Sequence, residues 1–241
     1  MKPTITPLVL STATFGLMLG VAQNAQAALI PGISVSSTLG TEAPPNWNIN
    51  NTVNGRGLPG NTPSLTGNHV TSTDVSTAWR SVVLTNPVGT TIPGASITFN
   101  LNGTYLVSGF TFWNFGGTSA PLTRQGIRNV TVEYFDGTNW LAAPGAPTTF
   151  TQGLFNTAPT PPADQIAQPY SFTTPVTTNL IRFNNLSNFG NLAATNNQIG
   201  FNEVQFDGTV PPPPPTQIPE PSSLLALLAV GLGGVSLRKR I

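Results

Sequence analysis

The chain of 241 residues is 7% charged, with 9 Lys and Arg against 8 Asp and Glu, whereas an ordinary soluble domain is roughly a quarter charged. Hydrophobic residues make up 39% and include 13 Phe, so a core can be filled. Cysteine is absent, which excludes thiol catalysis and cysteine-ligated metals. Between the two ends of the chain, five Arg stand against seven Asp and Glu. Without a basic patch for a phosphate backbone, we do not expect nucleic-acid binding.

Residues 1–27 have the three parts of a secretory signal. Lys2 is the charged start, residues 8–21 are the apolar centre, and Ala25-Gln26-Ala27 fits the small-x-small cleavage rule. We therefore expect signal peptidase to cut after Ala27. An uncleaved N-terminal membrane anchor is the alternative, which the short apolar centre disfavours.

Residues 28–209 are predicted to form one all-β domain. Short runs that alternate or carry β-branched and aromatic residues are separated by turn residues such as Asn102-Gly103 and Asp136-Gly137. Because no long helical periodicity separates them, the runs indicate an antiparallel β-sandwich of the jelly-roll kind. The predicted strands are 97–101, 106–115, 130–135, a return strand carrying Trp140, 171–173, 180–183 and 201–206.

Two proline-rich segments interrupt or follow this domain. Residues 142–169 are predicted to form a surface loop with a weak strand at 148–152. Five consecutive prolines, Pro211 to Pro215, predict a stiff polyproline spacer over 210–217. We expect the spacer to hold the domain off the membrane while the C-terminal tail remains uncut.

Residues 218–241 combine a Pro219-Glu220-Pro221 triplet, an apolar run over 224–237 and a basic end, Arg238-Lys239-Arg240. The run is cheap to bury in hydrocarbon and the cations resist translocation, although a full membrane crossing takes about 20 residues. The three parts in this order resemble the PEP-CTERM sorting signal of Gram-negative bacteria. The resemblance implies a transient anchor in the inner membrane and cleavage by an exosortase-type protease. Delivery to the cell surface or the extracellular matrix would follow.

The body resembles a discoidin-type domain, the galactose-binding-like jelly roll of coagulation-factor C-type domains and many carbohydrate-binding modules. The order of the matching pieces carries the resemblance, and Asn54 stands where that family usually has an acid. The matching pieces are Ile33–Ser37, Thr52–Gly55, Thr77–Arg80, Ser96–Asn114, Val130–Trp140, Ile181–Phe183 and Asn202–Val204.

This resemblance implies a structural calcium ion. The matching positions are Asn54, Thr77 and Glu203, and Asp74 is close in sequence. Calcium takes six to eight oxygen ligands, often backbone carbonyls with one or two carboxylates. The alternative is that Glu203 pairs with a surface Arg and that no metal binds, and both remain open.

Sugar binding needs an aromatic face beside groups that hydrogen-bond to hydroxyls. We expect Trp47 and Arg80 to be the first candidates, because they lie in the loop-rich part of the chain. A Trp at a strand end can equally serve core packing. The full set of candidates is Trp47, His69, Trp79, Arg80, Trp113 and Asn114.

Catalysis has little support in the sequence. His69 is the only histidine and no Gly-x-Ser-x-Gly motif accompanies it. Glu133 and Glu203 fall inside predicted strands, which suits sheet-surface positions better than a facing pair across a cleft. We therefore predict an exported, surface-sorted, non-enzymatic protein that binds glycan or matrix polymer. The alternatives are a structural biofilm or cell-surface matrix protein without a specific small ligand, and an unrecognised hydrolase.

Overall fold

The computed structural model describes residues 28–43, 45–71, 75–85, 89–117, 119–155, 164–190 and 197–213. The predicted signal peptide, Asp74, and the predicted sorting signal with its membrane segment 224–237 lie outside the described residues. Within the described ranges, no helix is both long and apolar enough to cross a membrane.

The domain is an antiparallel β-sandwich, which confirms the predicted fold class. All seven strand pairs in the described part of the chain are antiparallel, and the strand order is β1-β8-β4-β7-β5-β6, with β2 added to β4 and β3 to β8. The helices are short, with three or four residues each. The strands are β1 (Ala28–Leu29), β2 (Ser34–Ser37), β3 (Trp79–Arg80), β4 (Ile97–Asn114), β5 (Thr131–Phe135), β6 (Trp140–Ala142), β7 (Gln168–Asn184) and β8 (Gly200–Thr209); the helices are η1 (Ile49–Thr52), η2 (Pro59–Asn61) and α1 (Ala120–Thr123).

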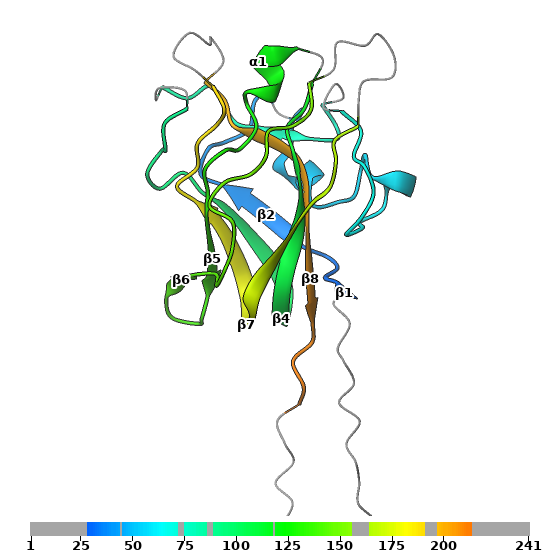
Figure 1. The fold of residues 1–241 in the computed structure, drawn as a ribbon, viewed down its shortest axis with the longest axis vertical. Helices are drawn as coiled ribbons and strands as arrows, with labels where there is room; N and C mark the ends of the chain where they lie inside the picture. Colours follow the sequence, from blue (N-terminus) through cyan, green and yellow to red (C-terminus); the bar gives the residue numbers. More distant parts are fainter. Residues whose placement is uncertain are drawn as a thin grey trace, which may run out of the picture.

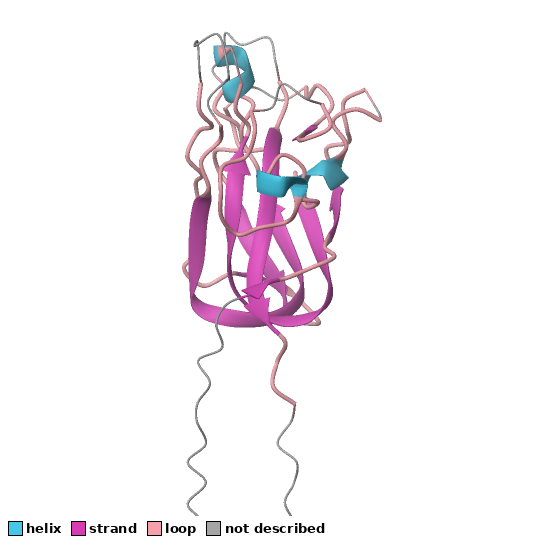
Figure 2. Cartoon of the chain, turned by 90° about the vertical axis from the view of Figure 1, so that its right-hand side faces the viewer, coloured by secondary structure: helices cyan, strands magenta, loops and turns pink. Residues whose placement is uncertain are grey.

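The two long strands β4 and β7 run through both layers of the sandwich. The first half of β4 pairs with β2 and the second half with β8, while β7 accompanies β4 from Phe183 back to Gln168. Both strands bend at the end of the domain where the chain leaves (Figures 1 and 2). The bent, paired strands β4 and β7 therefore join the two layers.

The bend corrects the prediction of a chain-reversing turn at Asn102-Gly103. Asn102 has a φ of 55°, and its N–H donates to Asn100 Oδ1 over 2.9 Å. A register shift between Asn100 and Tyr105 follows, yet β4 continues. The runs predicted separately at 171–173 and 180–183 are likewise parts of the single strand β7.

Aromatic side chains from both layers fill the core. Ile97, Phe99 and Leu101 are fully buried, as their strict alternation predicts. Phe112 stacks on Phe150 with ring centroids 4.1 Å apart. Because Phe150 belongs to the 142–169 segment, that segment is anchored to the core at this point. The weak strand predicted there is reduced to a single bridge between Asn129 and Thr149.

A loop over residues 55–71 covers the outer face of the β4–β8 layer. Thr111 Oγ1 donates to the Leu65 carbonyl over 2.9 Å, and Trp113 Nε1 donates to the Gly67 carbonyl over 2.9 Å. Glu203 lies opposite Trp113 on β8 and is fully buried under the same loop. The prediction that Glu203 occupies a sheet-surface position is therefore wrong.

Candidate functional site

The connecting segments around α1 and the two ends of the domain lie at opposite ends of the sandwich (Figure 1). Ala28 pairs with Gly208, so both chain ends leave together, next to the start of the proline spacer. We call the end that carries α1 the loop end. Any ligand bound there faces away from the segment that leads to the sorting motif.

Trp47 and Arg80, the two first candidates for sugar binding, lie together at the loop end. The guanidinium carbon of Arg80 is 4.5 Å from the centroid of the Trp47 ring. Arg80 also forms an ion pair with Glu42 and donates from Nη1 to Gln125 Oε1 over 3.2 Å. The Trp47 ring packs against Phe115 as well and is only 9% exposed. Most of the surface of this ring is therefore already in contact with the protein.

Trp79 and Trp113 are fully buried. Trp79 Nε1 donates to the Gly40 carbonyl over 3.1 Å, and its ring packs edge-on against Phe201. Trp113 is held under the 55–71 loop. A ring with no exposed face has nothing to offer a sugar in this structure, so we leave both out of the proposed binding surface.

Asn114 is also buried, and its side-chain amide joins three chain segments. Oδ1 accepts from the N–H groups of Phe115 and Ile127, each over 2.9 Å. Nδ2 donates to the carbonyls of Ile127 over 2.7 Å and Thr151 over 2.8 Å. These four bonds use the full hydrogen-bonding capacity of the amide, which indicates a structural role.

His69 is enclosed by the loop that contains it. Nδ1 lies 2.7 Å from the Val70 carbonyl and 3.0 Å from Asn202 Nδ2. Burial lowers the pKa of the imidazole below its ordinary value. A methyl group on Gly57 would lie 2.5 Å from the ring, so the loop can close over His69 only with glycine there. This packing gives His69 a place in the loop rather than at an accessible surface.

Of the predicted metal ligands, Glu203 has the most distinctive surroundings. Oε1 accepts from the Gly55 N–H over 3.0 Å and from the side chain of Gln205, while Oε2 has no hydrogen-bond partner in the described part of the chain. Burial raises the pKa of this carboxyl to about 8. The partners are thus a loop amide and a glutamine, not the surface Arg considered as an alternative.

Asn54 and Thr77, the other predicted metal ligands that the structure describes, add no carboxylate to Glu203. Asn54 is exposed, and its Oδ1 accepts from the Arg56 N–H over 2.8 Å. Thr77 is buried, and Asp74 lies outside the described residues. Across the described ranges, no three His, Asp or Glu side chains are close enough together to hold a metal ion.

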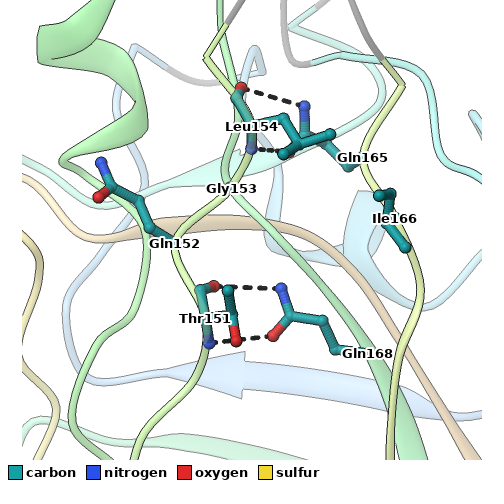
Figure 3. Close-up of a pocket in the computed structure, with 7 residues that line it drawn as sticks. All are labelled: Thr151, Gln152, Gly153, Leu154, Gln165, Ile166 and Gln168. Carbon is teal, nitrogen blue, oxygen red and sulfur yellow. Dashed lines mark hydrogen bonds between the residues drawn. The ribbon is translucent and has the colours of Figure 1, made fainter.

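A pocket of about 180 Å³ opens beside α1, between two segments of the 142–169 region (Figure 3). Gln165 accepts from the Leu154 N–H over 2.7 Å and donates to its carbonyl over 3.4 Å. Gln168 does the same to Thr151, with both contacts at 3.1 Å. Two side-chain amides thus take the place of a backbone ladder and hold the segments apart. The pocket is lined by Thr151, Gln152, Gly153, Leu154, Gln165, Ile166 and Gln168.

Sequence reasoning missed this pocket, and it missed a second Trp–Arg–Glu cluster on β5, β6 and β7. Arg182 lies over the Trp140 ring, 4.2 Å from its centroid, and its Nη2 is 2.6 Å from Glu133 Oε2. Cross-strand register could have found the cluster, because Glu133 and Arg182 are direct partners in the sheet. The pocket gives no comparable pattern in the sequence.

Comparison with known proteins identifies the C-terminus. Residues 217–240 match the PEP-CTERM protein-sorting motif, which confirms the resemblance found in residues 218–241. The motif marks a chain for export and surface sorting. No curated protein matches the chain.

Solved structures that match the domain include carbohydrate-binding modules and an F5/8 type C domain. The family 32 module of C. perfringens NanJ, in complex with galactose, is 12% identical and covers 76% of this chain and 99% of its own, with a TM-score of 0.41. The F5/8 type C domain from Bacteroides fragilis is 14% identical (77% and 97% covered, TM-score 0.45). The family 32 module of Streptococcus pneumoniae EndoD is 15% identical (74% and 98% covered, TM-score 0.42). At this identity the likeness concerns the fold alone.

Proposed function

We propose that the protein is a surface-sorted glycan-binding module that does not transform its ligand. The observation that carries the proposal is the position of an uncharged pocket at the loop end, opposite the segment that leads to the sorting motif. After signal peptidase and an exosortase-type protease act, the loop end would face the polysaccharide or matrix polymer outside the cell. The Trp47–Arg80 pair stays a candidate for the edge of this surface.

The positions of the two glutamates support binding rather than hydrolysis. A glycosidase needs two carboxyl groups on either side of the scissile bond. Glu133 is paired with Arg182 on the β5–β7 face, whereas Glu203 is buried under the 55–71 loop on β8. Each carboxylate is engaged on a different strand, and neither lines the pocket.

A glycan array probed with the full chain in detergent tests the proposal. We expect retention of a small set of related glycans, because a shaped pocket selects among sugars. If no glycan is retained, the result would favour a structural matrix protein without a specific ligand. Release of shorter products from a retained glycan would favour the hydrolase.

We also propose that a calcium ion binds at Glu203. The Oε2 atom of Glu203 is buried without a hydrogen-bond partner among the described residues, which supports a cation there, because a buried carboxylate oxygen without a partner is costly. Glu203 would supply the carboxylate, with Asn54, Thr77 and Asp74 as the further candidates carried by the sequence. Bound calcium would fix the 55–71 loop over the β4–β8 layer.

Calcium should raise the melting temperature more at about pH 8.5 than at about pH 6, because binding needs the ionised carboxylate and the metal-free pKa is about 8. Thermal unfolding of the full chain with millimolar calcium or EDTA measures this. The Glu203→Gln variant serves as the control and should show no calcium effect. An equal calcium effect in both proteins would remove Glu203 from the site.

A further inference from the structure

Exposed apolar side chains concentrate around the pocket. Of the eight large hydrophobic residues exposed in the described ranges, Leu154 (38%), Phe155 (48%) and Ile166 (58%) lie on or next to its lining. Val70 follows His69, whose backbone pairs with Gln165, and so adds a fourth. Phe155 is the only aromatic residue among the eight. Such clusters on soluble domains mark binding surfaces.

The base of the pocket is closely packed. Gln165 is buried and lies so close to the backbone that a methyl group on Gly116 would be 2.0 Å from its Nε2. A methyl group on Gly153 would be 2.2 Å from the Phe115 carbonyl oxygen. Because the contact at Gly153 is with backbone, that position admits only glycine, and a larger residue at Gly116 would displace the Gln165 amide. The pocket therefore has a defined shape, as ligand sites usually do.

The lining carries amides and a hydroxyl but no charge. Gln152 is exposed and donates from Nε2 to Thr123 Oγ1 over 3.0 Å, which orients its amide and leaves Oε1 as an acceptor. Gln168 accepts from the Tyr170 hydroxyl over 2.9 Å as well. An uncharged lining gives a carboxylated sugar no counter-charge, whereas amides suit neutral hydroxyl groups.

We infer that this pocket binds one neutral sugar unit of a glycan. The apolar side chains of Leu154 and Ile166 contact its C–H face, the remaining Nε2–H of Gln168 donates to one of its hydroxyls, and Phe155 offers the exposed ring beside it. The inference rests on the proposed function and gives it a site and a ligand class. The volume of about 180 Å³ suits a single ring rather than a chain.

The experiment measures binding of the full chain to a panel of neutral and uronate-containing polysaccharides at low and high salt. We expect neutral polymers to bind with an affinity that salt hardly changes, because no ion pair forms. Ile166→Asp and Phe155→Ala should each weaken binding about tenfold or more. The matched control is Val83→Asp, at a 66% exposed position after β3, which should bind as the parent does. Thermal unfolding confirms that each variant is folded.

Each result decides the inference. Selective loss in the two pocket variants supports it. Neutral binding that both folded pocket variants retain would overturn the site and leave the proposed function standing. Preferred uronate binding that falls steeply with salt would overturn the ligand class. Absence of binding to every polymer would overturn the inference together with the proposed function.

Discussion

Between about pH 5 and about pH 9, the metal-free protein should lose on the order of 4 kcal/mol more unfolding free energy than its Glu203→Gln variant. Burial raises the pKa of Glu203 from its ordinary value of 4.5 to about 8. The folded state therefore binds the proton more tightly than the unfolded state does. This contribution to stability is complete below about pH 4.5 and is lost as the pH rises through 8.

Chemical denaturation of both proteins in EDTA across this pH range measures the difference. The comparison removes the opposing contribution of His69, whose lowered pKa costs stability as the pH falls below about 6.5. Both proteins carry His69, so its effect cancels. Parallel stability profiles for the two proteins would show that the Glu203 carboxyl titrates as an exposed group, in conflict with its burial under the 55–71 loop.

Asn114→Ala should lower the free energy of unfolding by about 4 kcal/mol, because four hydrogen bonds of about 1 kcal/mol each are lost. Two buried N–H groups, those of Phe115 and Ile127, would lose their acceptor. Urea unfolding followed by tryptophan fluorescence gives the value.

The control for this variant is Asn68→Ala, at an exposed loop position, which should change stability by less than about 0.5 kcal/mol. A stable Asn114→Ala protein that fails to bind glycan would contradict the structural role and restore Asn114 as a ligand-binding residue.

The strands could be predicted because their pattern is local. Alternation in Ile97, Phe99 and Leu101 corresponds to their burial, and the Asp136-Gly137 turn does join β5 to β6. The course of β4 could not be predicted, because an Asn-Gly pair such as Asn102-Gly103 is compatible either with a turn that reverses the chain or with a bend inside one strand. Pairing partners far along the chain, on β2 and β8, decide between the two.

The burial of Glu203 also depends on contacts distant in sequence. A strand with polar residues on alternate positions predicts a solvent face, yet the 55–71 loop covers this one, with Gly55 bonded to Glu203 and His69 in contact with Asn202. Polar groups on that face then bond to the loop instead of water. Nothing within β8 itself signals such a cover.

The candidate site was predicted only in part. The sequence placed Trp47 and Arg80 in the same loop-rich region, and they do stack. The pocket depends on two glutamines that bridge to residues 11 and 17 positions earlier, and on glycines that admit Gln165. These features exist only after folding. The sorting motif is different, because it is a contiguous segment that is recognised from sequence.

The most direct test of the account is hydrogen–deuterium exchange of the full chain with and without the polysaccharide that it retains most strongly. We predict slower exchange over residues 151–155 and 164–168 at the loop end, and no change in β1 or the end of β8. Protection confined to the β5–β6 face around Trp140, with the loop end unchanged, would contradict it.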